Sequence, residues 1–578
     1  MFPYLRKYSH YFFQYKLHLI IGALTILLTN TFGAVKPMIL KYAIDDLQKD
    51  IQWEKILYLA AAIIALAVIQ GVFRFIMRRV VIGVSRKAEF GLRRDFIEHL
   101  QRLSLSYYDK NTTGDIMARG TSDIEAVRMV YGPGLMYSAD TVVVTAFSLT
   151  MMFTLSWQLT LAALAIMPLV SVTVYFLGKK TFKFHQLVQE GYSSLNTFTQ
   201  ENIAGVRVVK AFALEDQHTG RFGLLAKEYL KRNMSLVKMQ ALFMPLLYFI
   251  FGLGILIVLW IGGVSIIEER ITLGSFAAFA SYLMMLSWPM IAVGWVVNIF
   301  QRGEASMERI DKIMTTQPEI SNHPQAYTGK LNPVIEFRNL SFAYDERGEV
   351  LHNLNLKIPS GHTVGIVGAT GSGKSTIVRL IPRIYNPPPD TLFIDSIPVE
   401  RIDLMNLRNS IAFVPQDTFM FSDSIEANIA CSDKIPPERI VQAAETAGFS
   451  RDVEAFPDKF KTMVGERGIS LSGGQKQRAS LARALLKDAP ILILDDALSA
   501  VDASTEAEIL QNLKRVFQDK TVIVVTHRVS TAAPMDMIIV MDNGAIVERG
   551  KHEELLSLEG IYYRLYRRQM LEKELETI

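Results

Sequence analysis

The distribution of apolar residues is the strongest constraint on the fold, because they are concentrated before about residue 300 of 578. A helix that crosses a bilayer needs roughly 20 mostly apolar residues. Six stretches meet that requirement: residues 17–40, 56–77, 134–155, 159–177, 241–262 and 276–300. In hydrocarbon, the backbone polar groups must be satisfied within the segment itself. We therefore expect six membrane-spanning helices.

The connections between these stretches are very unequal, and the two long ones carry clusters of basic residues. The first long connection contains Arg78, Arg79, Arg86, Lys87, Arg93 and Arg94, and the second contains Lys179, Lys180, Arg207, Lys210 and Arg221. Positive charge gathers on the cytosolic side of a membrane, so both long connections and both termini are expected in the cytosol. Their helical period predicts that the spans continue as helices and meet in hairpins near residues 107–115 and 211–216.

Several residues inside the expected spans leave two interpretations open. Four prolines lie there, at Pro37, Pro168, Pro245 and Pro289. Each can kink a helix, which would either shape a cavity or adapt the packing. Asp140 either faces a cavity or lies at the cytosolic interface. The sixth span contains Met284, Met285, Trp288, Met290 and Trp295. These side chains suit either an adaptable apolar ligand site or contact with lipid and other helices.

The second half of the chain has a different character. A polar, proline-containing segment near residues 315–333 has no clear period and is expected to be a linker. Beyond it, short β-rich runs alternate with helical stretches, as in an α/β domain. The single cysteine, Cys431, cannot form an internal disulfide, which suits a domain in the reducing cytosol. The net charge of +4 gives no reason to expect a nucleic-acid partner.

A phosphate-binding loop begins this second half. The pattern Gly368-x4-Gly373-Lys374-Ser375 follows a strand-like run and precedes a helix-like one, which is the context that such a loop requires. Glycines allow backbone N–H groups to curl around phosphate oxygens, and the helix N-terminus adds partial positive charge. The residues expected to bind ATP here are Gly368, Thr370, Gly371, Ser372, Gly373, Lys374, Ser375 and Thr376.

Two residues of this half are expected to hold Mg²⁺. Ser375 follows the lysine of the loop and should ligate the ion, while Lys374 reaches the β- and γ-phosphates. Asp495 ends an apolar strand, residues 491–495, and should bind the same ion directly or through water. The cofactors that the sequence predicts are therefore ATP and Mg²⁺.

Between the phosphate loop and Asp495 lies the sequence Leu471-Ser472-Gly473-Gly474-Gln475. With these three motifs the chain resembles a bacterial ABC exporter half-transporter of the multidrug and lipid type, over essentially its whole length. The resemblance implies an α-helical membrane bundle of six long spans, extending into the cytosol and followed by an α/β ABC-type nucleotide-binding domain. The implied boundaries are residues 1–315 for the transmembrane domain, 316–333 for the linker and 334–578 for the ATPase domain.

The resemblance also assigns roles to residues that would mean little singly. Tyr344 would stack on adenine, and Gln416 would sense Mg²⁺ and face the membrane half. Ser472, Gly473, Gly474 and Gln475 would clamp ATP bound to the opposite subunit. Residues 499–502 would form the D-loop, residues 465–468 would touch the partner's hairpins, and His527 would lie near the γ-phosphate. The catalytic residues that it implies are Asp496, His527 and Gln416.

Asp496 departs from the family pattern, in which a glutamate normally polarises the attacking water. Aspartate is one methylene shorter, so its carboxylate falls roughly 1 Å short, and a misplacement of that size can cost ~10²-fold in rate. The resemblance implies that such a chain often pairs with a different subunit that carries the glutamate. This chain's signature would then serve the partner's competent site. The alternative is a homodimer with two weak sites.

The function that these features favour is ATP-driven export of amphipathic drugs, lipids or peptides across the bacterial cytoplasmic (inner) membrane. The expected partners are a second ABC half-transporter, the lipid bilayer and the substrate. An alternative is a nucleotide-gated regulator or channel, to which Asp496 gives some weight. A soluble ATPase that acts on nucleic acid is incompatible with six spans.

Overall fold

The computed structural model describes residues 2–48, 52–344, 348–431, 435–465 and 471–576, apart from some side chains within helices. Contacts divide the chain into two compact units. The first comprises Met1–Gln101 and Thr113–Thr316, and the second comprises Arg102–Thr112 and Gln317–Ile578. The short stretch Arg102–Thr112, which overlaps the hairpin predicted near residues 107–115, therefore groups with the C-terminal unit.

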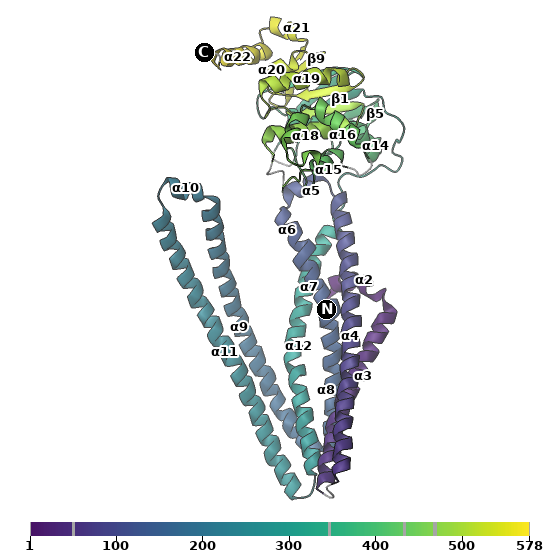
Figure 1. The fold of residues 1–578 in the computed structure, drawn as a ribbon, viewed down its shortest axis with the longest axis vertical. Coiled ribbons are helices and arrows are strands. Elements are labelled where there is room, and N and C mark those ends of the chain that lie inside the picture. The colour runs from purple at the N-terminus through teal and green to yellow at the C-terminus, as the bar shows by residue number, and fades with distance from the viewer. Residues whose placement is uncertain (1, 49–51, 345–347, 432–434, 466–470, 577–578) are drawn as a thin grey trace. The chain divides into compact units, whose positions relative to one another are not determined.

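The described part of the first unit consists of helices joined by short turns, and its long helices are the purple-to-teal rods of Figure 1. Its helices are α1 (Pro3–Lys7), α2 (His10–Phe13), α3 (Lys16–Leu47), α4 (Trp53–Arg102), α6 (Thr113–Ala118), α7 (Ile124–Met129), α8 (Leu135–Leu155), α9 (Trp157–Ala204), α10 (Val206–Ala211), α11 (Glu215–Ile267) and α12 (Leu273–Met314). Two π-helical turns, η1 (Arg119–Asp123) and η2 (Val130–Gly134), join α6, α7 and α8 into one continuous rod.

Five helical segments among the described residues are long and apolar enough to cross a membrane: Lys16–Leu47, Trp53–Arg102, Thr113–Leu155, Glu215–Ile267 and Leu273–Met314. The expected span at residues 159–177 belongs to α9, but the side chains of residues 166–171, 174 and 175 lie outside the described part of the chain. Pro168 is among them. The count of six spans therefore stays a prediction.

The long connections are helical in the structure. α4 runs without a break to Arg102, and α9 runs to Ala204, where α10 turns the chain into α11. α9 and α11 pack along each other, as Figure 1 shows. The prolines at positions 37, 245 and 289 lie inside α3, α11 and α12. Asp140 of α8 accepts a 2.8 Å hydrogen bond from the amide of buried Asn30, so α3 provides it with a polar partner.

The second unit contains two sheets. The larger has the strand order β10-β9-β3-β8-β7-β6, in which β10 is antiparallel to β9 and the other neighbours are parallel. Its strands are β3 (Thr363–Gly368), β6 (Ile411–Val414), β7 (Ile491–Asp495), β8 (Thr521–Val525), β9 (Met537–Asp542) and β10 (Ala545–Gly550). The smaller sheet has the order β2-β1-β4-β5, with β1 (Ile335–Phe342), β2 (Leu351–Ile358), β4 (Leu392–Ile394) and β5 (Ile397–Pro398).

Helices surround these sheets. They are α13 (Lys374–Leu380), α14 (Leu404–Asn409), α15 (Ile425–Ala430), α16 (Pro437–Thr446), α17 (Ser450–Ala455), α18 (Gly473–Leu486), α19 (Ala503–Phe517), α20 (Val529–Ala532), α21 (His552–Ser557) and α22 (Ile561–Glu576). The helix α5 (Leu105–Lys110) also belongs to this unit. The 3-10 turns are η3 (Val399–Arg401) and η4 (Lys459–Lys461).

The inner strands β7 and β8 of the larger sheet are buried on both faces. In β7, Ile491 and Ile493 pack into one hydrophobic cluster, while Leu492 and Leu494 pack into another. Successive side chains of a strand point to opposite faces, so a run without polar residues predicts a strand covered on both sides. The carboxyl ends of β3, β6, β7 and β8 meet at one edge of this sheet.

Candidate functional site

A cavity of about 300 Å³ opens at that edge of the sheet. It is lined by Val350, Thr370, Gly371, Gly373, Lys374, Ser375, Thr376, Gln416, Asp496, Val525, Thr526 and His527. Chain segments far apart in the sequence supply these residues, because each parallel strand delivers the loop after it to the same edge. The cavity thus brings the predicted phosphate loop together with Gln416, Asp496 and His527.

The phosphate loop connects β3 to α13 and depends on its glycines. Gly368, Gly371 and Gly373 have φ values of 155°, 85° and 92°, a region that side chains disfavour. A Cβ atom on Gly368 would lie 2.2 Å from the Met541 carbonyl oxygen, and one on Gly373 would lie 2.7 Å from a Leu351 methyl carbon. Only glycine fits at these two positions, so the loop's tight curvature follows directly from the sequence.

Lys374 folds back over this loop. Its ammonium donates to the carbonyl oxygens of Gly368 at 2.9 Å and Ala369 at 2.7 Å. Burial lowers the pKa of the Lys374 ammonium, while the nearby carboxylates Asp496 and Asp495 oppose that shift. The ammonium is therefore held over the loop by neutral acceptors, from which an anionic phosphate would draw it readily.

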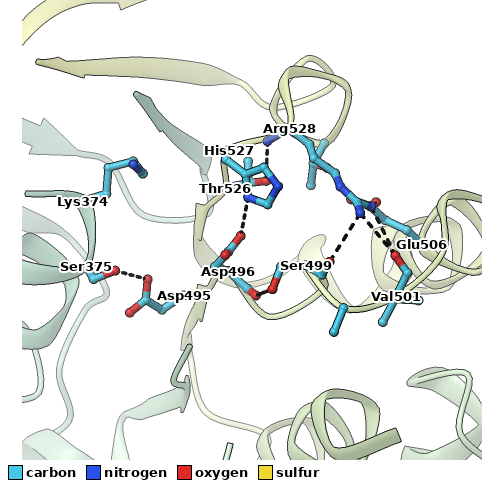
Figure 2. A network of polar contacts seen from close by, with 12 residues as sticks. Lys374, Ser375, Asp495, Asp496, Ser499, Val501, Glu506, Thr526, His527 and Arg528 are labelled. Carbon is cyan, nitrogen blue, oxygen red and sulfur yellow. Dashed lines mark hydrogen bonds and ion pairs between the residues drawn. The ribbon is translucent and has the colours of Figure 1, made fainter. Parts of the chain in front are cut away.

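Asp495 lies beneath the loop and is completely buried. One carboxylate oxygen accepts a 2.7 Å hydrogen bond from the Ser375 hydroxyl, a contact visible in Figure 2. The other oxygen, Oδ2, is buried without a hydrogen-bond partner. Burial raises the pKa of the Asp495 carboxyl, although the Ser375 hydrogen bond and the Arg379 charge oppose this shift. The Nε atom of Arg379 lies 3.9 Å from that Oδ2 atom. A buried carboxylate with an oxygen that accepts no hydrogen bond, beside a hydroxyl, suits a hard divalent cation.

Within the described ranges, no three His, Cys, Asp or Glu side chains form a cluster that would hold a metal ion alone. Ser375 and Asp495 would therefore share such a cation with phosphate oxygens and water, because small hard cations keep several water ligands and bind phosphate oxygens.

Asp496 turns away from Asp495 because its backbone is left-handed, with φ 50°. Its N–H donates to the Val525 carbonyl oxygen at 2.9 Å. Its Oδ1 atom lies 3.0 Å from Nδ1 of His527, the contact drawn at the centre of Figure 2. The two adjacent carboxylates thus have different partners: Asp495 contacts Ser375, and Asp496 contacts the half-exposed His527 in the cavity.

The loop after Asp496 is braced from two sides. Ser499 donates to the Asp496 carbonyl oxygen at 3.0 Å, and the side chain of Gln477 bonds both Ser499 and the N–H of Ala500 at 2.9 Å. Arg528, next to His527, pairs with the buried Glu506 of α19. These contacts tie the predicted D-loop to α18 and to the histidine loop, so a movement of one would displace the others.

Tyr344 follows β1 and touches the loop from outside. Its hydroxyl donates to the Thr376 hydroxyl at 3.1 Å. Its ring meets the ring of Tyr385 edge to face, with centroids 4.8 Å apart. The Tyr385 hydroxyl in turn donates to a carboxylate oxygen of Asp109, on α5, at 2.8 Å. Burial and this hydrogen bond both raise the pKa of the Tyr385 phenol.

The predicted signature residues are not among those lining the cavity. Ser472 caps α18: its hydroxyl accepts from the Gln475 N–H, and its own N–H donates to the Gln475 side chain at 2.9 Å. A Cβ atom on Gly473 would meet only the Ala500 methyl carbon, at 3.5 Å. On Gly474 it would lie 2.9 Å from the Ala500 carbonyl oxygen. Gly473 is therefore open, and Gly474 packs against the D-loop.

Sequence reasoning did not identify Tyr385 or Gln569. Gln569 of α22 donates to the His527 carbonyl oxygen and accepts from the Val529 N–H at 2.8 Å, so the last helix holds the histidine loop. Neither residue has a local motif, and each acts on a segment distant in the sequence. Of the predicted partner-contact loop at residues 465–468, only Gly465 is described.

Three features define a P-loop ATPase unit. They are a phosphate loop shaped by glycines, a buried aspartate that accepts a hydrogen bond from the serine of the loop, and an aspartate–histidine pair in the same cavity. In this chain that unit follows a set of helices long enough to cross a membrane. The molecule therefore combines an ATPase unit with helices that can cross a membrane, as a nucleotide-driven membrane protein requires.

Comparison with known proteins gives the family. Residues 19–290 match the ABC transporter transmembrane region, and residues 351–499 match the ABC transporter family model. The probable multidrug resistance ABC transporter ATP-binding/permease protein YheI of Bacillus subtilis is 36% identical, with 99% of this chain and 98% of the relative covered. The ATP-dependent lipid A-core flippase of Syntrophus aciditrophicus is 35% identical, with 96% and 91% covered.

Among solved structures, a bacterial Atm1-family ABC exporter with ATP bound matches with a TM-score of 0.79 and 26% identity, over 96% of this chain and 98% of that chain. The chain therefore belongs to the ABC transporter family. It is an ATP-driven exporter subunit that has its transmembrane region and its ATP-hydrolysing region in one polypeptide.

Proposed function

We propose that this chain is the slow-site subunit of a heterodimeric exporter, which moves amphipathic drugs, lipids or peptides out of the cytosol by alternating access. Two nucleotide domains would close around ATP, the cytosolic hairpins would carry that closure to the spans, and hydrolysis would reset the cycle. The chain would lie in the bacterial cytoplasmic membrane, with residues 1–315 as its transmembrane domain and residues 334–578 as its ATPase domain in the cytosol.

The geometry of Asp496 carries the proposal of a slow site. Its short carboxylate bonds His527 at 3.0 Å, and its backbone N–H is bound to Val525, so both ends of the residue are held. A glutamate would extend one methylene further into the cavity, where an attacking water must be polarised. Misplacement of a general base by about 1 Å can cost on the order of 10²-fold in rate.

Each other predicted residue has a role in this scheme. Lys374 would neutralise the β- and γ-phosphates, and Tyr344 would stack on adenine. Ser375 and Asp495, with Gln416 through water, would hold Mg²⁺; the Oδ2 atom of Asp495, which is buried and accepts no hydrogen bond, supports this. The ion, when bound, neutralises charge that develops on the transferred phosphate. The signature from Ser472 to Gln475 would act on ATP bound to the partner.

ATP-dependent uptake into inverted membrane vesicles tests export directly. The vesicles contain the complex, which is purified through a tag on this chain. They should concentrate a fluorescent amphiphile only when ATP is present. A regulator or channel would equilibrate the amphiphile without concentrating it, and that result would replace the exporter proposal.

The asymmetry has its own test. Asp496→Asn should leave most of the ATPase activity of the assembled complex intact, because the competent base lies on the partner. Asp496→Glu should raise the rate of single-turnover hydrolysis at this chain's own phosphate loop. Loss of nearly all turnover in Asp496→Asn would contradict the heterodimer and favour a homodimeric lipid flippase, the candidate that the similarity to a lipid A-core flippase supports.

A further inference from the structure

Two cationic side chains lie within the apolar stretches of neighbouring helices. Lys36 is well inside α3, and Arg74 lies in the apolar part of α4. A charge at membrane depth is expensive, and one that is retained there is first suspected of a functional role. Neither residue takes part in the nucleotide site.

Lys36 is held by a neutral partner. Its ammonium donates to the side-chain oxygen of Gln70 on α4. Gln70 lies directly against α3 at Gly33, since a Cβ atom on that glycine would come 2.7 Å from the Gln70 amide nitrogen. The glycine therefore makes room for the amide that orients the lysine. A hydrogen bond to an amide leaves the positive charge of the ammonium uncompensated.

Arg74 adds a second charge to the same place. It lies one helical turn beyond Gln70, so the two side chains share a face of α4. Because Gln70 itself bonds the Lys36 ammonium, Arg74 lies on the face of α4 that holds Lys36. Across the part of the chain that the structure describes, neither cation has an ion pair with a carboxylate, whereas the buried Arg128 of α7 pairs with Glu89. Two adjacent cations without a counter-ion favour an anionic ligand, and a guanidinium suits phosphate or carboxylate best.

An apolar surface adjoins these charges. The terminal methyl of Met285, on α12, lies 3.9 Å from the same Cβ position on Gly33. Further along α12, Trp288 and Trp295 meet the ring of Tyr137 edge to face, at 6.4 and 5.1 Å between centroids. Thioethers and aromatic rings adapt to apolar ligands of varied shape. A molecule with an anionic head and an apolar body would match both parts.

We propose that Lys36, Gln70 and Arg74 bind the anionic head group of the transported amphiphile, with its apolar part lying along Met285 and the aromatic residues of α12. The inference rests on the proposed export function and narrows the substrate class to anionic amphiphiles. The competing hypothesis is that Arg74 extends to the cytosolic interface and interacts only with lipid head groups. Arg78 distinguishes the two, because it is an exposed arginine one turn further along the same face of α4.

The test measures binding without ATP, in nanodiscs of neutral lipid that contain the complex purified through this chain. The probes are radiolabelled dodecyl phosphate and dodecyltrimethylammonium, which share a chain and differ in head charge. Wild type should prefer the phosphate. Lys36→Gln and Arg74→Gln should each weaken its binding about tenfold or more, the usual effect of losing a hydrogen bond to a charged group. Lys36→Arg should restore binding, and Arg78→Gln should leave it unchanged.

Gln70→Glu provides a second, independent variant, because it gives Lys36 an internal counter-ion and should weaken anion binding while adding no bulk. Two unlabelled competitors identify the ligand. Competition by phosphatidic acid in the disc assigns the site to a bilayer lipid. Competition by free inorganic phosphate shows that the apolar body is dispensable and contradicts the two-part site. Equal binding of both probes, or equal losses in Arg74→Gln and Arg78→Gln, would overturn the proposal. Failure of ATP-dependent uptake with intact anion binding would instead refute export alone.

Discussion

Lys374 illustrates how a single residue can be prepared for a ligand. Its ammonium bonds two carbonyl oxygens of its own loop, and burial lowers its pKa. We expect Lys374→Ala to weaken nucleotide binding at this chain's phosphate loop by about 10- to 100-fold, the range for a lost hydrogen bond to a charged group. Site-resolved binding of a fluorescent ATP analogue measures this. Lys514→Ala, on the exposed surface of α19, is the matched control; unchanged affinity in Lys374→Ala would contradict its role.

The buried carboxyl of Asp495 predicts how the stability of the protein depends on pH. Burial raises the pKa of its carboxyl above the ordinary value of 3.8. A carboxyl with a higher pKa in the folded state binds protons more tightly there, so stability falls as the pH rises from the unfolded pKa to the folded one. The cost is therefore larger at pH 7 than near pH 4. Asp495→Asn should therefore raise the unfolding midpoint of the nucleotide-free protein at pH 7, and raise it less near pH 4.

Calorimetry of the purified complex at both pH values tests the Asp495 prediction. The same variant should lose the extra stabilisation that ATP with Mg²⁺ gives, since a carboxylate oxygen for the ion is gone. Asp496→Asn, at the neighbouring and partly exposed acid, should change the midpoint of the nucleotide-free protein less. An unchanged midpoint for Asp495→Asn at pH 7 would show that the buried charge is compensated by Ser375 and Arg379.

At the scale of single residues, motif spacing predicted the phosphate-loop side of the cavity, whereas Gln416 and His527 were expected only from the family resemblance. Glycine spacing located the phosphate loop because only glycine tolerates its backbone angles and close contacts. An apolar run that ends in two acids located Asp495 and Asp496. Tyr385 and Gln569 could not be predicted, because their side chains reach segments that only the tertiary fold brings near.

At the scale of elements, α5 is joined to the nucleotide cavity by one hydrogen bond. Asp109 on this short helix accepts from Tyr385, whose ring touches Tyr344. Tyr385→Phe removes the hydroxyl and keeps the ring, so nucleotide affinity should persist. We expect substrate-stimulated ATPase activity to fall several-fold, consistent with loss of about 0.5–1.5 kcal/mol. Asp109→Asn keeps an acceptor and should be milder. Equal stimulation in wild type and Tyr385→Phe would exclude this contact from coupling.

The elements themselves were unequally predictable. Apolar length identified α3, α4, α11 and α12, because an uninterrupted apolar run of about 20 residues matches the thickness of a bilayer. The π-helical turns that join α6, α7 and α8 have no signal in hydropathy, since one residue more per turn leaves the apolar composition unchanged. Alternation between two hydrophobic clusters explains why the sequence of β7 is a continuous apolar run, unlike that of a half-buried strand.

At the scale of the whole molecule, we expect the signature and the phosphate loop of one chain to serve different sites. The signature residues are absent from the lining of the cavity that holds Lys374 and Asp496. In the proposed heterodimer this chain gives a short acid to one site and an intact signature to the other. Substitutions at the two places should therefore differ in effect, although both lie in the same domain.

Gly473→Asp should stop ATP hydrolysis and transport by the whole complex, whereas Asp496→Asn should be much milder. A side chain at Gly473 meets only the Ala500 methyl carbon at 3.5 Å, so the variant should fold and insert normally. Its carboxylate would instead obstruct closure of the two domains over ATP on the partner and would repel the phosphates of that ATP. Gly473→Ala, which adds a methyl without charge, should fall between wild type and Gly473→Asp. Steady-state ATPase assays on the three complexes decide the order. If Gly473→Asp proved milder than Asp496→Asn, the fast and slow sites would have to be exchanged.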